Sequence, residues 1–157
     1  MKDSVFKISA DGYSYLMVLP HWETDYIQGL LANTLQPYEL AMLRSMATML
    51  KPGELVLDVG ANIGNHSMYL AEVTGCRVWA FEPNPELYWP LVETISLNNL
   101  DGKILPHQKG IGSAIGRAHF TKHTPDNLGG QSLMVDNSES STISIITLDS
   151  LDIKDKV

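Results

Sequence analysis

The sequence is poor in cysteine, in long apolar runs and in positive charge, and each shortage excludes a class of protein. Its single cysteine, Cys76, cannot form an internal disulfide, which argues against a disulfide-stabilised secreted domain. No apolar run approaches the ~18 residues that cross a bilayer, and the N-terminus has no signal-peptide pattern. We therefore predict a cytoplasmic protein that has no membrane partner.

Basic residues are outnumbered, with 11 Lys and Arg against 18 Asp and Glu and a net charge of -7. Proteins that bind a polyphosphate backbone collect Lys and Arg, so this balance predicts that nucleic acid is not a partner. The chain has 157 residues, of which 44% are hydrophobic, enough for a domain with a buried core. An acidic surface of this kind is compatible with a small-molecule ligand.

Buried strands and helices alternate along the middle of the chain. The predicted elements are a helix over 37–50, a strand over 55–59, a helix from 63 to Gly75, a strand over 78–82, a helix over 84–98 and a strand over 103–110. Strands with nearly continuous apolar runs are typical of sheets covered on both faces. Right-handed crossovers between such strands make the sheet parallel, so the predicted fold class is α/β.

The flanking segments are less regular. Residues 4–20 predict a β-hairpin around the turn pair Asp11-Gly12. Residues 21–36 show no clear periodicity, and we expect a loop with at most one helical turn. Near the C-terminus, 117–124 and 141–151 are expected to be strands, and the residues between them form a polar loop.

The stretch "LVLDVGANIG" places a glycine turn between a strand and a helix, where ligands with phosphate or nucleoside groups bind. A P-loop is excluded because, counted from Gly60, Asn65 and His66 occupy the positions of its second glycine and its lysine. A dinucleotide fingerprint requires glycine at positions 60, 62 and 65, and only Gly60 is present. An NAD-dependent oxidoreductase is therefore disfavoured and is kept as an alternative.

A nucleoside without a diphosphate fits the turn better. Gly60 and Gly64 allow close approach, and Asn62 can bond a polar tail. Glu82 ends the next strand, 22 residues after Gly60, near the ~20-residue spacing at which an acid binds ribose hydroxyls. S-adenosylmethionine has these groups, and its positive sulfonium tolerates nearby acids such as Asp58. The competing interpretation is that Asp58 only caps the turn and Glu82 is a solvated acid.

The segments "VLDVGANIGNHSMYLA" and "VWAFEPNPELY" resemble the FkbM-type S-adenosylmethionine-dependent methyltransferases. The resemblance extends over about residues 37–151, with further landmarks at Pro37–Glu39 and Thr147–Leu151. It implies a Rossmann-like methyltransferase sheet and an acceptor that is a hydroxyl group of a sugar, lipid or natural product. The cofactor-binding residues that it implies are Asp58, Gly60, Ala61, Asn62, Gly64, Glu82 and Asn84, with the turn Gly110–Gly112 as a further candidate.

In the FkbM-type family, a further strand follows the segment that corresponds to "TLDSL", and this chain stops there. We therefore expect a hairpin and connecting segment over 1–36 and a partial methyltransferase domain over 37–157, with the C-terminal strands of the fold missing. The strand 55–59 would then be an open edge. Three outcomes are expected: a truncated chain, a homo-oligomer that covers this edge, or residues 141–148 folding back onto it. A non-catalytic binding or assembly module is a second alternative function.

No catalytic residue is identified from the sequence. The candidate bases are Glu39, Asp126 or a residue outside this chain, and Glu39 is better explained as an acid that complements a helix dipole. His119 and His123 are four residues apart on a predicted strand, where they share a face without converging on one ion. We therefore predict no metal site, and a small-molecule or carbohydrate-like acceptor.

Overall fold

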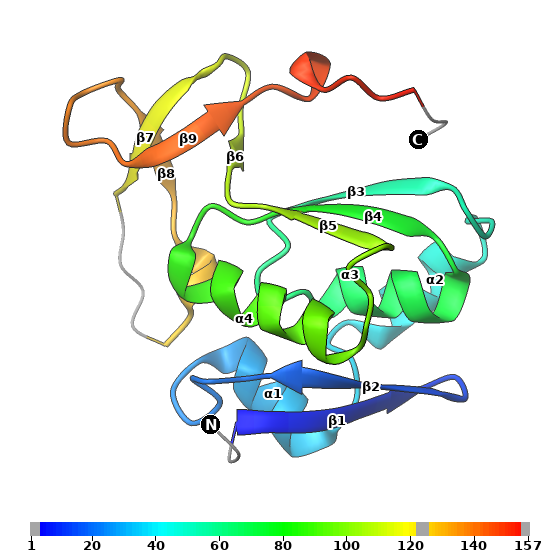
Figure 1. The fold of residues 1–157 in the computed structure, drawn as a ribbon. Coiled ribbons are helices and arrows are strands. Elements are labelled where there is room, and N and C mark those ends of the chain that lie inside the picture. The colour runs from blue at the N-terminus through cyan, green and yellow to red at the C-terminus, as the bar shows by residue number, and fades with distance from the viewer. Residues whose placement is uncertain (1–3, 122–125, 155–157) are drawn as a thin grey trace.

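The computed structural model describes residues 4–121 and 126–154 (Figure 1). Its elements are β1 (Val5–Ala10), β2 (Tyr13–Val18), α1 (Tyr26–Thr34), α2 (Leu40–Ala47), β3 (Leu55–Val59), α3 (Asn65–Tyr69), a π-helical turn η2 (Leu70–Thr74), β4 (Arg77–Phe81), α4 (Pro85–Leu97), β5 (Ile104–His107), β6 (Gly110–Ile111), β7 (Gly116–Phe120), a 3₁₀ turn η3 (Leu128–Gly130), β8 (Leu133–Val135), β9 (Ile143–Ile146) and a 3₁₀ turn η4 (Leu148–Ser150).

The central sheet is parallel, with strand order β3-β4-β5, as the sequence predicts. Val78 lies beside Val56 on one side and Ile104 on the other, and the buried residues Val78, Ala80 and Ile104 belong to the main core. Helices α3 and α4 lie on the same face of this sheet in Figure 1. Strand, helix, strand, helix and strand thus confirm the α/β prediction.

The helix after β3 begins and ends at glycines in the left-handed region. Gly64 has φ 90° and precedes α3, and Gly75 has φ 74° and follows the π-helical turn η2. The predicted end of this helix at Gly75 is confirmed. A Cβ at Gly64 would lie 2.6 Å from Leu91 Cδ1, so this position is restricted by packing against α4 as well as by its backbone.

Helix α4 runs without a break through Pro90. Its N-terminus is capped by the Asn84 side chain, which accepts a hydrogen bond of 3.0 Å from the Glu86 amide. Leu87, Leu91 and Ile95 are buried along one stripe of the helix. This stripe anchors α4 against the sheet.

The predicted hairpin is present, and it packs on α4. Strands β1 and β2 pair antiparallel around Asp11 and Gly12. The Val18 amide donates to Thr94 Oγ1 over 3.0 Å, and this bond is buried. Asn98 accepts from the Leu16 amide and donates to the Leu16 carbonyl, both over 2.8 Å. Side chains of α4 therefore replace a third strand at one edge of the hairpin.

Two loop predictions are wrong. Residues 21–36 contain the helix α1, which begins because the Asp25 side chain accepts from the Gln28 amide over 3.0 Å, and which buries Gln28 and Leu31. The expected polar loop before β9 contains η3 and β8, which pairs with β7. The strand predicted over 117–124 is observed as β7, which ends at Phe120, and residues 122–124 lie outside the described part.

The second sheet has the order β6-β9-β7-β8. Gly110 and Ile111, predicted to lie in a turn, form β6. Strand β9 pairs with β6 and β7, so the expectation that residues 141–148 fold back onto 55–59 is wrong. Within residues 4–121 and 126–154, β4 is the strand that pairs with β3, and the second edge of β3 has no strand beside it.

Candidate cofactor site

The site is built around Glu82, which follows the last residue of β4 at the carboxyl edge of the parallel sheet. Glu82 is only 5% exposed. Its Oε2 accepts a hydrogen bond of 2.8 Å from the Asn62 amide, and its Oε1 accepts one of 2.7 Å from the Asn84 amide. Each carboxylate oxygen therefore has one lone-pair direction fixed by the backbone and keeps a second for a ligand.

Burial raises the pKa of Glu82 to about 7, against an ordinary value of 4.5. The hydrogen bonds that the backbone amides of Asn84 and Asn62 donate to the carboxyl group oppose this rise in pKa, and the nearby charge of Asp58 adds to it. The group is thus balanced between its acid and its carboxylate near neutral pH. Strongly shifted carboxyl groups in clefts are typical of functional sites.

The glycine turn after β3 supplies the other wall. The amides of Gly60 and Ala61 both donate to the Phe81 carbonyl, over 2.9 and 3.0 Å, which holds the turn beside the end of β4. Gly60 has φ 80°, and a Cβ built on it meets no atom of the described residues within 4 Å. The space above Gly60 is therefore open to a ligand that approaches the backbone.

Asn62 shapes the turn from within. It has φ 55°, in the left-handed region that costs a non-glycine residue energy, and its Oδ1 accepts from the Ile63 amide over 2.8 Å. Its own amide orients Glu82. The sequence assigned the Asn62 side chain to the polar tail of a ligand, and in the structure this side chain stabilises the turn.

Asp58 and Asn84 also have structural partners. Asp58 Oδ2 accepts from Ser67 Oγ over 2.6 Å, which links the end of β3 to α3. Asn84 caps α4 through its side chain and donates its amide to Glu82. The structure brings Gly60, Asn62, Glu82 and Asn84 together in the wall of one hollow, and Asp58, Ala61 and Gly64 support the turn from behind.

Neither candidate base belongs to this hollow. Glu39 precedes α2 in the left-handed region, with φ 56°, and its Oε2 lies 3.3 Å from His66 Nε2. The Asp126 carbonyl accepts from the Tyr26 amide over 2.9 Å. The catalytic residue thus stays unidentified.

The hollow beside Glu82 has a volume of about 130 Å³. It is lined by Gly60, Asn62, Glu82, Pro83, Asn84, Phe120, Leu128, Gly129, Gln131 and Leu133. A hollow of about 470 Å³ shares Asn84, Phe120 and Gln131 with it, and one of about 170 Å³ shares Gly60, Pro83 and Leu133. The central hollow has room for a sugar ring, and the two neighbours leave room for groups on either side.

Sequence reasoning missed the half of the lining that comes from Phe120 and residues 128–133. Its one local signal is the pair Gly129-Gly130, because paired glycines often mark a close approach of two backbones. A Cβ on Gly129 would collide with Asn62 Nδ2. The rest of this wall depends on contacts between residues far apart in the chain, which no local pattern contains.

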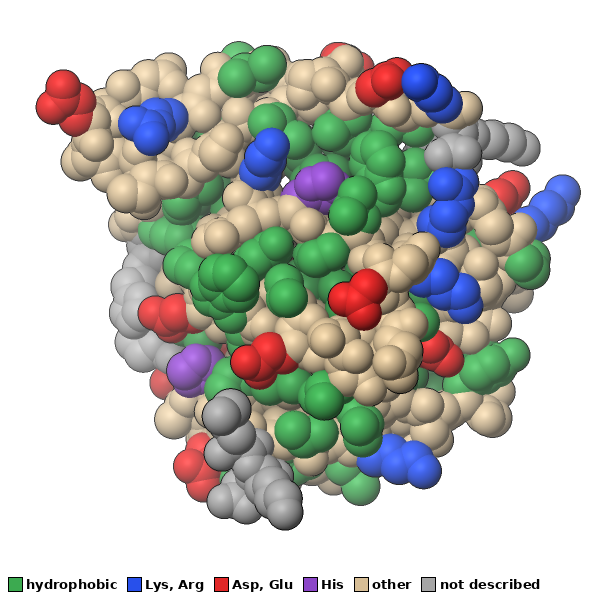
Figure 2. Space-filling model, in the orientation of Figure 1, with side chains coloured by type: hydrophobic (Ala, Val, Ile, Leu, Met, Phe, Trp, Pro, Cys, Tyr) green, Lys and Arg blue, Asp and Glu red, His purple; other side chains and the backbone are tan. Residues whose placement is uncertain are grey.

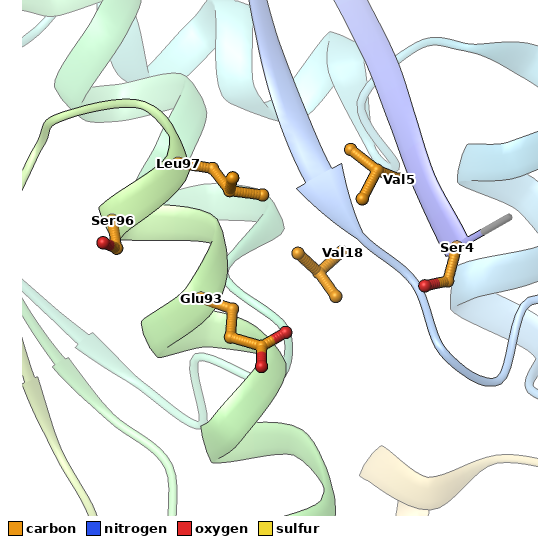
Figure 3. Close-up of a pocket in the computed structure, with 6 residues that line it drawn as sticks. All are labelled: Ser4, Val5, Val18, Glu93, Ser96 and Leu97. Atoms are coloured by element: carbon orange, nitrogen blue, oxygen red, sulfur yellow. The ribbon is translucent and has the colours of Figure 1, made fainter. Parts of the chain in front are cut away.

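A larger groove lies elsewhere, between the hairpin and α4 (Figure 3). It has a volume of about 320 Å³ and is lined by Ser4, Val5, Val18, Glu93, Ser96 and Leu97. None of the predicted cofactor residues lies in it. Its lining is mostly apolar and has no set of convergent polar groups, so we assign the ligand site to Glu82.

The prediction of no metal site concerns His119 and His123, and His123 lies outside the described residues. His119 Nδ1 lies 3.2 Å from Asp136 Oδ2 and 3.4 Å from Ser141 Oγ. These two contacts join β7 to the loop before β9. Across the part of the chain that the structure describes, no group of three or more His, Cys, Asp or Glu side chains could hold a metal ion.

Residues 39–114 match the family model of the TRM5/TYW2 methyltransferase domain. The fold resembles P. horikoshii TYW2 in complex with MeSAdo, with a TM-score of 0.51 and 24% identity over 73% of this chain and 39% of that one. It also resembles, with a TM-score of 0.46 and 20% identity, M. jannaschii Trm5 in complex with adenosine, over 66% of this chain and 29% of that one. No curated protein matches the chain.

Residues 39–114 of the chain are thus similar to a methyltransferase domain. This match agrees with the predicted S-adenosylmethionine-dependent class of enzyme and cofactor. The predicted Rossmann-like methyltransferase fold is confirmed. The finer assignment to the FkbM-type family is not, because the family model that matches is that of TRM5/TYW2. The chain spans 39% of the length of the TYW2 structure that it resembles.

The prediction that nucleic acid is not a partner is wrong as an exclusion. The matching domain is that of TRM5/TYW2, and the neighbours include a complex of aTrm5 and tRNALeu, with a TM-score of 0.47 and 19% identity over 70% of this chain and 32% of that one. The prediction used net charge, which sums over a whole chain and does not describe the surface that faces a ligand. The net charge is also that of a chain which covers only 32% of the length of the aTrm5 chain.

Among the described residues, no helix is both long and apolar enough to cross a membrane. The cytoplasmic location stays a prediction from the sequence.

Proposed function

We propose that this chain binds S-adenosylmethionine at Glu82 and supports methyl transfer to an acceptor. The observation that carries the proposal is the buried Glu82 carboxyl group, whose two oxygens are each oriented by one backbone amide while keeping lone pairs for two ribose hydroxyls. One carboxylate that accepts from two vicinal hydroxyls is a strong and geometrically specific contact.

The residues present fit this cofactor. The hollow at Glu82 has the size of a ribose, and its continuation on two sides provides for the adenine and for the amino-acid tail. The open space above Gly60 allows the ligand to lie against the turn. Gly129 packs directly on Asn62, which leaves little room for a diphosphate, so the structure supports the cofactor over NAD.

When bound, S-adenosylmethionine supplies an activated methyl group on a positively charged sulfur. The chain's own contribution is positional: Glu82 holds the ribose, the turn 60–64 fixes the distance between ligand and sheet, and the buried setting excludes water. An acceptor must reach the methyl group in line with the bond that breaks, and its proton must pass to a base. None of the described residues is assigned that role.

Two classes of acceptor are candidates. A tRNA acceptor is supported by the match of residues 39–114 to the TRM5/TYW2 methyltransferase domain. A hydroxyl group of a sugar, lipid or natural product is the second candidate, and the FkbM-like segments around Gly60 and Glu82 favour it. Figure 2 shows acidic and basic side chains scattered over one face of the described residues, without a continuous basic surface.

Isothermal titration of the intact chain with S-adenosylhomocysteine and with NAD tests the cofactor. We expect binding of S-adenosylhomocysteine only, and a loss of affinity of about tenfold or more in Glu82→Gln, because the amide offers one acceptor oxygen in place of two. Glu93→Gln, which makes the same charge change at an exposed position of α4, is the matched control. Binding of NAD alone would contradict the proposal.

The acceptor is tested by transfer of a labelled methyl group from S-adenosylmethionine to unfractionated tRNA and, separately, to a panel of glycosides and lipids. Label in tRNA supports the first candidate, and label in the hydroxyl panel supports the second. If the chain binds the cofactor and labels neither pool, a non-catalytic binding module becomes the better description.

A further inference from the structure

One wall of the Glu82 hollow is formed by residues 126–131, which we call the roof segment. Leu128, Gly129 and Gln131 line the hollow opposite Gly60 and Glu82. In Figure 1 the 3₁₀ turn of this segment, coloured orange, lies beside the start of α4. Gly129 packs so closely on Asn62 that any side chain there would displace one of them. The roof segment therefore determines how far the hollow is open.

The roof segment is attached to the N-terminal part of the chain. Asp25, only 3% exposed, accepts a hydrogen bond of 2.9 Å from the Leu128 amide through Oδ2. The same side chain accepts from the Gln28 amide through Oδ1, over 3.0 Å, and so caps α1. The neighbouring Tyr26 amide donates to the Asp126 carbonyl over 2.9 Å. The roof is thus tied to the start of α1 by two adjacent residues.

A buried carboxylate is costly unless both of its oxygens are satisfied, and here each accepts a backbone amide. A helix cap alone needs a single oxygen, which Ser, Thr or Asn supply equally well. The second oxygen of Asp25 accepts a hydrogen bond from the amide of Leu128, which lies about 100 residues further along the chain. This second bond is what distinguishes Asp25 from an ordinary capping residue.

We propose that Asp25 is a positioning residue of the cofactor site, which fixes the roof segment over the turn at Asn62 and thereby holds the hollow in its binding shape. This inference rests on the proposed function, because it assigns the hollow to the cofactor. Asp25 does not line the hollow, so its effect is transmitted through Leu128 and Gly129. It links α1 to the cofactor site at the edge of the sheet.

The substitution Asp25→Asn separates the two roles of this side chain. The Asn oxygen can still cap α1 at Gln28, whereas its NH₂ group cannot accept from the Leu128 amide. We expect faster hydrogen exchange at the Leu128 amide in the absence of ligand. We also expect about tenfold weaker binding of S-adenosylhomocysteine, since a misplaced wall loses contacts that the ligand makes. Asp101→Asn, at an exposed turn, is the matched control.

The measurements are amide exchange, titration with S-adenosylhomocysteine, and circular dichroism to verify that α1 persists. Unchanged affinity in Asp25→Asn, with only a lower melting temperature, would show a purely structural role and overturn the inference. If the unsubstituted chain does not bind S-adenosylhomocysteine, the proposed function fails by itself. The attachment of the roof is then decided by exchange alone: equal exchange at Leu128 in both chains would overturn it.

Discussion

Glu82 combines burial, two backbone donors and a position at the end of a parallel strand, and this combination makes the affinity for the cofactor depend on pH. Its pKa is raised from 4.5 to about 7, chiefly by burial. Two ribose hydroxyls can both donate to the carboxylate, whereas in the neutral acid one oxygen carries a proton and is a poor acceptor, so only one such bond is favourable. Below neutral pH the ligand must therefore displace a proton.

We expect the affinity for S-adenosylhomocysteine to rise by up to about tenfold between pH 6 and pH 8, as Glu82 ionises. Titration calorimetry at four or five pH values measures this rise, and Glu82→Gln should remove it. The unliganded chain should respond in the opposite sense. A folded-state pKa above the unfolded value contributes stability that is complete below pH ~4.5 and is lost as pH rises through ~7. A pH-independent affinity would exclude Glu82 as the ribose acceptor.

Gly64 gives a second prediction at the scale of one residue. It has φ 90°, and a Cβ there would approach Leu91 Cδ1 to 2.6 Å. Gly64→Ala should therefore lower the free energy of unfolding by about 1–3 kcal/mol, from left-handed backbone and overpacking together. Gly102→Ala is the matched control, because a Cβ at Gly102 meets nothing within 4 Å. Equal urea midpoints for the two variants would contradict this account.

At the same scale, the sequence predicted the residues of the turn and Glu82 because strand ends and glycine spacing are local signals. It did not predict what their side chains do. Asn62 was predicted to bond the polar tail of a ligand, and the sequence did not reveal that its side chain also stabilises its own turn by accepting from the Ile63 amide. Asp25 was not singled out, because its partner Leu128 lies far away in the chain.

At the scale of elements, the hairpin is docked on α4 by several hydrogen bonds, of which the one to Thr94 is buried. Thr94 is fully buried and accepts from the Val18 amide over 3.0 Å. Thr94→Val keeps the shape and removes the acceptor, so the Val18 amide is left buried without a partner. We expect a loss of about 1–3 kcal/mol in the free energy of unfolding.

Thr94→Ser is the control for this prediction, since it keeps the hydroxyl and removes a methyl group. Chemical unfolding should show a smaller loss for Ser than for Val. The reverse order would mean that packing of the Thr94 methyl group, and not the hydrogen bond, holds the hairpin on α4.

The elements that could be predicted are those with a strong period. Apolar runs or stripes mark β3, β4, β5 and α4. The ends of β3, β4 and α4 were predicted within one or two residues, whereas the range predicted for β5 was longer than the strand. α1 was missed because it buries only Gln28 and Leu31 and depends on a cap for its start. β8 has three residues and exists through pairing with β7, which the sequence does not specify locally.

At the scale of the whole molecule, charge was the least reliable guide. A net charge of -7 led to the exclusion of nucleic acid, and the match to the TRM5/TYW2 methyltransferase domain overturned it. The fold class, by contrast, follows from the order of strands and helices, and each of these elements is predicted by a local pattern of apolar residues. What a methyltransferase domain acts on depends on surfaces that this pattern does not encode.

The central claim is that one buried acid at the carboxyl edge of the sheet binds the ribose of the methyl donor. The most direct test is a crystal structure of the chain with S-adenosylhomocysteine. The account predicts both ribose hydroxyls within about 2.6–3.2 Å of the Glu82 oxygens. It also predicts that the roof segment stays on Asn62. The claim would be contradicted if the ribose lay away from Glu82 and the Glu82 carboxyl group were bound only to the amides of Asn62 and Asn84.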